Sequence, residues 1–277
     1  MANDMYQERL NALYGSLSLL PSADEHFYQQ LGYPDNLRSP EMLYDIAANL
    51  GVCAQTRVLD VGCGNGRYTC RLAARFGCQI TAVDPFDERL QQARERAERE
   101  GVDSHIAFKQ ASSGALPFDD DAFDFIWCRG TIVHVPALQQ GFNECARVLK
   151  AQGFMLMHTY FATELLELGE AAWLCKAMAF VQRNMYPTPV ETACQMAGLR
   201  IHAFEDVGSE WHEYLGMKVG RQGSFLLQEV ARLRRFKDEF VAAFGQHCYD
   251  TTLALYLCHI YPLLGKMSEV IYTLLKP

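Results

Sequence analysis

The fold is decided by the stretch Val58-Leu59-Asp60-Val61-Gly62-Cys63-Gly64-Asn65-Gly66-Arg67-Tyr68, in which an apolar strand runs into three alternating glycines. A second apolar run, 79–83, ends on Asp84, which lies 18 residues after the last glycine. Glycine allows a tight turn with positive φ and lets a ligand lie directly on the backbone. A carboxylate at the tip of the next strand can accept hydrogen bonds from the hydroxyls of a ribose. The spacing therefore predicts a nucleoside pocket between two neighbouring strands.

The order of the glycines separates two classes of ligand. A dinucleotide site has the pattern G-x-G-x-x-G, which aims a helix N-terminus at a pyrophosphate. Here the pattern is G-x-G-x-G, and the polar neighbours Asp60 and Asn65 suit a ligand with an amino-acid tail. The alternative is a tight strand–helix turn that binds no ligand.

From Arg57 onward, short apolar strands alternate with helical patterns, which is typical of a parallel sheet covered on both faces. Strands are expected near 57–61, 79–83, 105–109, 123–128, 153–160, 199–207 and 269–275. Helices are expected near 67–76, 87–101, 137–149 and 163–185. After a break at 187–189, a short helix is expected to end at Gly198, and 212–266 is expected to be mostly helical. Residues 1–50 also carry apolar residues at helical spacing.

The stretch 58–66, together with Ala82-Val83-Asp84-Pro85, resembles the S-adenosylmethionine (SAM) binding motif of the class I methyltransferase family. Specific motifs carry the resemblance over roughly 30–160, and beyond them only the order of elements matches. It implies an α/β fold with a Rossmann-like, seven-stranded, mostly parallel sheet, helices on both faces, N-terminal helices and a helical insertion before the last strand. One methyltransferase domain is expected over 1–277, with a helical cap at 1–50, a cofactor-binding core at 51–162, and lid helices with the last strands at 163–277.

The resemblance also implies which residues hold SAM. They are Asp60, Gly62, Cys63, Gly64, Gly66, Asp84, Pro85, Phe86, Ser112, Ser113, Cys128 and Arg129. Asp60 would face the ammonium group and Asp84 the ribose. Relatives commonly carry Asp-Ala where this chain has Ser112-Ser113, so the bond to the adenine edge would lack charge assistance.

Methyl transfer depends mainly on collinear placement of nucleophile, methyl group and sulfur. A base is needed only where the nucleophile carries a poorly acidic proton. The candidate proton acceptors, each near the carboxyl end of an expected strand, are His158, His134 and Glu210. The candidate substrate contacts are Tyr160, Trp211, His212 and Tyr28. No metal site is predicted.

The composition of the chain indicates which kinds of partner it can bind. The net charge of −8 disfavours a nucleic-acid substrate, and the one dense basic stretch, 232–237, is interpreted as a solvated helix face. The longest apolar run, 253–264, is too short for a membrane span. Ten cysteines are scattered without a C-x-x-C pair, which is typical of a reduced, cytoplasmic protein. A monomer or homodimer that binds a small-molecule acceptor, but neither nucleic acid nor membrane, is therefore expected.

Three functions stay open at this level. The leading one transfers a methyl group from SAM to a nitrogen or oxygen, or to a carbon, of a small molecule, with S-adenosylhomocysteine (SAH) as product. The second is a non-catalytic SAM-binding or scaffold protein. The third is an NAD-dependent oxidoreductase, for which neither the glycine continuation nor a hydride-site pair is evident. Arsenic methylation is disfavoured because the cysteines are scattered.

Overall fold

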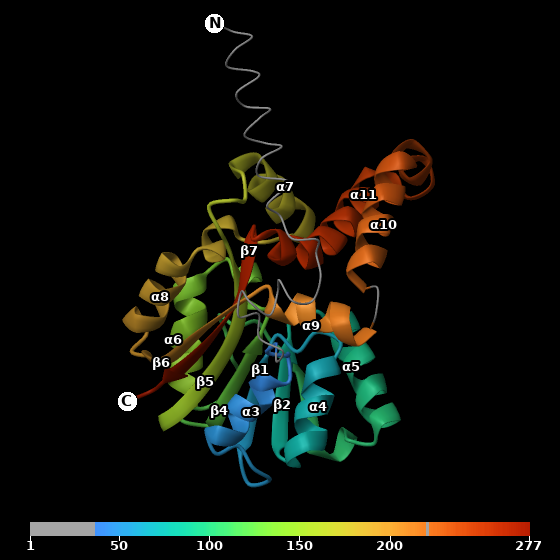
Figure 1. Cartoon of the computed structure of the whole chain (residues 1–277). Coiled ribbons are helices and arrows are strands. Elements are labelled where there is room, and N and C mark those ends of the chain that lie inside the picture. The colour runs from blue at the N-terminus through green and yellow to red at the C-terminus, as the bar shows by residue number, and fades with distance from the viewer. Residues whose placement is uncertain (1–36, 220–221) are drawn as a thin grey trace, which may run out of the picture. The chain divides into compact units, whose positions relative to one another are not determined.

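A seven-stranded sheet forms the centre of the molecule. The computed structural model describes residues 37–219 and 222–277, of which 38–277 belong to one compact unit. The strands lie in the order β3-β2-β1-β4-β5-β7-β6 (Figure 1). Their bounds are β1 (Arg57–Val61), β2 (Gln79–Asp84), β3 (Ile106–Gln110), β4 (Phe123–Arg129), β5 (Leu149–Ala162), β6 (Arg200–Gly208) and β7 (Met267–Leu275). Strands β1 to β5 pair in parallel, whereas β7 is antiparallel to β5 and to β6. The predicted Rossmann-like α/β fold is confirmed.

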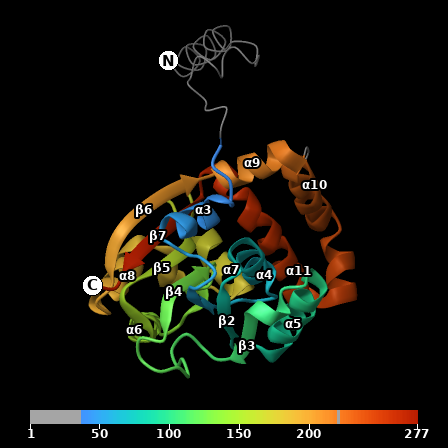
Figure 2. The same ribbon diagram turned by 90° about the horizontal axis from the view of Figure 1, so that it is seen from below.

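Helices cover both faces of this sheet (Figures 1 and 2). One face is covered by α3 (Met42–Asn49), α4 (Arg67–Phe76) and α5 (Asp87–Glu100), which share a core that includes Leu72 and Leu90. The other face is covered by α6 (Leu138–Val148) and α8 (Pro187–Met196), whose core includes Phe142 and Val190. Each fully buried side chain of this kind contributes roughly 1.5–3 kcal/mol relative to an exposed one, so the two cores hold the sheet between its helices.

The segment between β6 and β7 is helical, as predicted. It contains α9 (Glu210–Val219), α10 (Gln222–Arg235) and α11 (Lys237–Ile260), and α11 is kinked at Gly245, where φ is 83°. Together with α7 (Leu168–Met178), helices α10 and α11 enclose a third core. Val133, which follows β4, and Met267, which begins β7, are part of that core. The insertion therefore packs at the edge of the sheet where the parallel strands end.

Three element boundaries differ from the predictions. Strand β5 begins at Leu149, because an irregular start pairs Leu149 with Phe123 before the regular register begins at Phe154. The helix expected at 163–185 is the shorter α7, followed by a 3₁₀ turn at Gln182–Met185. The short helix predicted after the break is α8, but Pro187 is its first residue, since proline lacks the N–H that the first helical turn leaves unpaired.

Most of the predicted N-terminal cap, Tyr28 included, lies outside the described residues. Of the cap, the structure describes α3, which was predicted. The division of the chain into cap, core and lid stays a prediction.

Candidate functional site

The three glycines after β1 all adopt positive φ, but they serve different ends. A Cβ on Gly62 would lie 2.3 Å from Thr131 Oγ1, and one on Gly66 would lie 2.8 Å from Ala93 Cβ. Close packing therefore requires glycine at both positions. At Gly64, where φ is +54°, no described atom lies within 4 Å of the place that a Cβ would take. Gly64 thus offers bare backbone that a ligand can approach.

Asp84 stands beside this free backbone, at the tip of β2. Its Oδ2 accepts a hydrogen bond of 3.0 Å from the Gly64 N–H, and its Oδ1 accepts one of 3.0 Å from the Phe86 N–H. These bonds fix the carboxylate against the glycine loop. A carboxylate has about four acceptor positions, so lone pairs remain for further donors such as ribose hydroxyls.

The expected adenine region lies next to Asp84. A hollow of about 460 Å³ is lined by Pro85, Phe86 and Gln110, together with the start of α5, and Phe86 is 68% exposed. Ser112 is exposed and forms an isolated bridge with Ala115, while Ser113 is partly buried. An exposed aromatic ring beside a hollow is suited to stacking on a flat base.

Asp60 is buried within the sheet, with 2% of its surface exposed. Its Oδ2 accepts a hydrogen bond of 2.6 Å from Thr69 Oγ1, on α4. Burial raises the pKa of Asp60 to about 7, because the charged form is desolvated. The same loss of solvent raises the pKa of the thiols of Cys63 and Cys128. The side chain of Cys128 packs in the core beneath α6, so its implied cofactor contact stays a prediction.

The tips of β4 and β5 bring Arg129 and His158 together, because these two residues are partners in the parallel register. The Arg129 guanidinium carbon lies 3.5 Å from the centroid of the Tyr68 ring and 5.6 Å from that of Trp211. Trp211, on α9, stacks on the His158 ring with 4.8 Å between centroids. Three of the predicted site residues are therefore in one place, and Tyr160 lies edge-on to His158 at 6.3 Å.

Glu269 joins two imidazoles in this cluster. Its Oε2 is hydrogen-bonded to Nε2 of His158, and its Oε1 to Nε2 of His212 at 3.0 Å. Burial acts to raise the pKa of Glu269, but its interactions with the two imidazoles, both hydrogen-bonded to it, outweigh burial and hold that pKa well below its ordinary range. Burial lowers the pKa of His158, and Glu269 opposes that shift. No local pattern pointed to Glu269, because 111 residues separate it from His158.

The other two candidate proton acceptors have different surroundings. Nδ1 of His134 lies 3.2 Å from the carbonyl oxygen of Ala179, and the ring packs edge-on against Phe180. Loss of solvent in this contact lowers the pKa of His134. Glu210 accepts several hydrogen bonds from Arg38, including two from Nε at 2.9 and 3.0 Å, and these lower its pKa. A carboxylate tied in this way is a poor proton acceptor.

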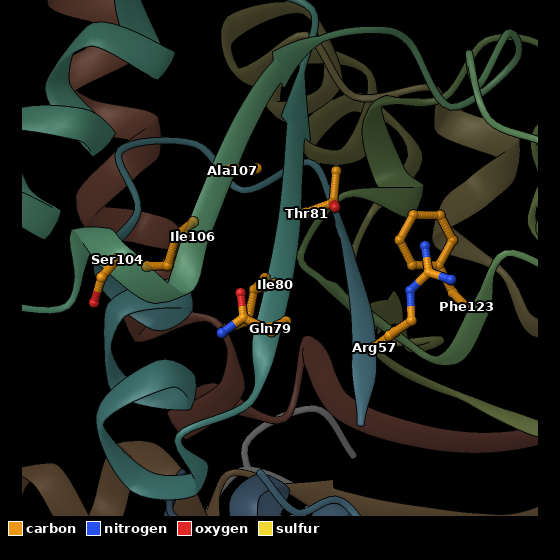
Figure 3. Close-up of a pocket in the computed structure, with 8 residues that line it drawn as sticks. All are labelled: Arg57, Gln79, Ile80, Thr81, Ser104, Ile106, Ala107 and Phe123. Atoms are coloured by element: carbon orange, nitrogen blue, oxygen red, sulfur yellow. The ribbon is translucent and has the colours of Figure 1, made fainter. Parts of the chain in front are cut away.

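A second hollow, of about 200 Å³, lies at the opposite edge of the sheet (Figure 3). It is lined by residues at the starts of the strands, such as Arg57, Gln79, Ile106 and Phe123. Ligands of open parallel sheets bind beyond the carboxyl ends of the strands, and this hollow lies at the opposite, amino ends.

A glycine loop that leaves backbone free beside a fixed acid, at the carboxyl edge of a sheet in this order, is typical of a class I SAM-dependent methyltransferase domain. Residues 59–157 match the family model described as a methyltransferase domain. Through this segment the chain is similar to the class I SAM-dependent methyltransferases, whose cofactor is SAM. The free backbone at Gly64 and the spare acceptor positions of Asp84 fit that cofactor.

Comparisons with individual proteins agree with the family. The methyltransferase GfsG of Streptomyces halstedii is 37% identical over 116 residues, which are 42% of this chain and 41% of that protein. The chain thus spans about two fifths of the length of such curated relatives.

Two solved structures share the fold over most of the chain. The [4+2]-cyclase SpnF has a TM-score of 0.65 at 22% identity and covers 86% of this chain and 81% of its own. Phospholethanolamine N-methyltransferase 2 of Haemonchus contortus, in complex with phosphomonomethylethanolamine and SAH, has a TM-score of 0.62 at 22% identity, with 90% and 56% covered. At this identity, both likenesses show the fold alone.

Metal sites and membrane-spanning helices also bear on the class of protein. Within 37–219 and 222–277, no group of three His, Cys, Asp or Glu side chains is placed to hold a metal ion. In the same described ranges, no helix has both the length and the apolar character that crossing a membrane requires.

Proposed function

We propose that this protein transfers the methyl group of SAM to a nitrogen or oxygen atom, or to a carbon, of a small-molecule acceptor. The observation that carries the proposal is the bare backbone of Gly64 beside the fixed Asp84 carboxylate. The match to the methyltransferase family model supports it, and the acceptor would bind at the cluster at the tips of β4 and β5, next to the glycine loop.

The chain's own residues would bind and orient SAM and the acceptor, and would exclude water from the site. SAM, when bound, supplies a methyl group on a sulfonium and departs as SAH. Gly64 would leave room for SAM to lie against the backbone, and Asp84 would accept hydrogen bonds from its ribose. Trp211 and Tyr68, on α9 and α4, flank Arg129 and shield the strand tips from water. Placement in such a dry site is the main requirement of the reaction.

His158 is the residue that we propose to accept a proton from the acceptor. Its Nε2 is held by Glu269, and among the described residues its buried Nδ1 has no hydrogen-bond partner. A carboxylate that orients one nitrogen leaves the other free to act as a base. Because burial lowers the pKa of His158, the neutral form that can take a proton is favoured.

The experiment that tests the proposal measures both binding and turnover. Calorimetry is expected to show micromolar or tighter binding of SAH and none of NAD. Release of SAH from SAM is then followed over a panel of amines, phenols and carboxylates. Binding of NAD without SAH would overturn the assignment. Binding of SAH with no turnover over the whole panel would instead favour the non-catalytic alternative, or another reaction on the same fold.

The role of His158 is tested once an acceptor is found. His158→Ala is expected to lower kcat by roughly 100-fold or more, the scale of losing a general base, with SAH affinity nearly unchanged. His134→Ala and Glu210→Ala are the comparison variants. Near wild-type turnover in all three would show that placement alone drives the reaction and that the proton leaves to water.

The proposal also covers the protein's cellular location, its partners and its oligomeric state. Scattered cysteines and the acidic balance support a cytoplasmic enzyme that binds neither nucleic acid nor membrane. A monomer or a homodimer is proposed, and light scattering at two protein concentrations would distinguish them.

A further inference from the structure

Four buried polar groups gather on the α3 face of β4 without partners. They are Nη1 of Arg129, Nε1 of Trp127, Nε1 of Trp211 and the hydroxyl of Tyr44, and no hydrogen-bond partner lies within reach of them among the described residues. Trp127, Trp211 and Tyr44 are each at most 3% exposed. A buried polar group left unpaired costs roughly 1–3 kcal/mol, so four together require an explanation.

These groups, called here the donor cluster, are contiguous. Trp127 and Arg129 are two residues apart on β4 and therefore point to the same face. Tyr44, on α3, stacks on Trp127 with 5.2 Å between centroids. Trp211, on α9, faces the Arg129 guanidinium at 5.6 Å.

The donor cluster has one unpaired acceptor beside it, Nδ1 of His158, whose ring stacks on Trp211, and is otherwise made of donors. An indole N–H and a guanidinium can only donate, and a phenol hydroxyl can do so. Burial lowers the pKa of Arg129, and the acid whose charge opposes this is Glu269. Both oxygens of Glu269 already bind His158 and His212, and no salt bridge to Arg129 exists in the described part of the chain. The positive charge of Arg129 is therefore without a close counter-charge.

We propose that the donor cluster binds an anionic group, a carboxylate or a phosphate, carried by the methyl acceptor. Arg129 lies at the tip of β4 in register with His158 on β5, on the far side of β1 from Asp84. An acceptor anchored there by its anion would have its nucleophile near His158. This rests on the proposed function, because it names the chemical class of that acceptor.

The probe for the donor cluster is a small anion. Inorganic phosphate and acetate are titrated at constant ionic strength into protein saturated with SAH, and tryptophan fluorescence is followed, since two of the chain's three tryptophans belong to the cluster. A saturable change is expected. Arg129→Gln should weaken it about 10- to 100-fold, the effect of losing one charge-assisted hydrogen bond. Arg99→Gln, at an exposed arginine on α5, should leave it unchanged.

A second measurement separates binding from a structural role. If Arg129 only supported the fold, Arg129→Gln would lower the melting temperature of the ligand-free protein. A binding residue that is buried without a counter-charge should leave that temperature equal or higher. Arg129→Lys, which keeps the charge but loses the planar pair of donors, is the variant to use if Arg129→Gln does not fold, and it should retain part of the affinity.

Several outcomes would overturn the inference. Equal phosphate and acetate binding by the wild type and Arg129→Gln would show that the anion lies elsewhere. Competition between phosphate and SAH, with a matching loss of SAH affinity in Arg129→Gln, would show that the cluster serves the cofactor's own carboxylate. Failure of SAH to bind at all would instead refute the proposed function, and the same titration on ligand-free protein would still test the donor cluster.

Discussion

Asp60→Asn should change how the stability of the ligand-free protein depends on pH. Burial raises the pKa of Asp60 from its ordinary 3.8 to about 7. Between those values the folded protein holds a proton that the unfolded chain has released, so stability falls as pH rises. A shift of about three units, at about 1.4 kcal/mol per unit, corresponds to a loss of about 4 kcal/mol. Asparagine does not titrate and removes this loss.

Urea unfolding, followed by circular dichroism between pH 4.5 and pH 8, measures the effect. The free energy of unfolding of the wild type should fall by about 3 kcal/mol relative to that of Asp60→Asn over this window, because the rest of the loss lies below pH 4.5. The two slopes are compared, and not the absolute values, because the buried amide of asparagine adds a constant cost of about 1–3 kcal/mol. Asp103→Asn, at an exposed position, should run parallel to the wild type. If Asp60→Asn also runs parallel to it, the pKa of Asp60 is not raised and the reasoning fails.

Four further predictions concern the cofactor site and the insertion. Asp84→Asn should weaken SAH binding roughly 10- to 1000-fold by calorimetry, because hydrogen bonds to a charged acceptor are lost; unchanged affinity would place the ribose elsewhere. Gly62→Ala should destabilise the protein by about 2 kcal/mol or more, since its Cβ would overlap Thr131. Gly64→Ala should cost only about 1–2 kcal/mol of backbone strain in thermal unfolding but at least about 10-fold in SAH affinity; equal effects of the two variants on both would contradict the assignment of the free surface. Hydrogen exchange should slow in α9 and α10 when SAH and acceptor bind, and protection confined to 58–86 would rule out a lid.

Local patterns allowed most of the fold to be predicted. The strands that hold the glycine loop were expected at 57–61 and 79–83 and are Arg57–Val61 and Gln79–Asp84, because apolar runs bounded by glycine depend on neighbouring residues alone. The positions of β5 and α8 were less accurate. The irregular start of β5 is imposed by its pairing with β4, which no period in the sequence reveals.

The site was predicted where it is local and missed where it is not. Asp84 beside Gly64 follows from a fixed spacing, and the hydrogen bond between them agrees with it. Glu269 was missed, and the ion pair that ties Glu210 to Arg38 was not foreseen, since 172 residues separate those partners. The cofactor roles of residues such as Ser112 stay predictions until a bound ligand is observed.

The position of β7 also has a consequence for how the protein is made. β7 lies between β5 and β6, so β6 has its place in the sheet only after Met267–Leu275 is available. During synthesis, β1 to β5 can assemble while β5 still exposes an unpaired edge, which is a hazard for association with other chains. His158 is on that strand, and its partner Glu269 arrives with the strand that closes the edge. In a nascent chain, the partner of the proposed base and the protection of the sheet edge would therefore arrive in the same late step. Substitutions that weaken β7 should increase aggregation as well as reduce activity.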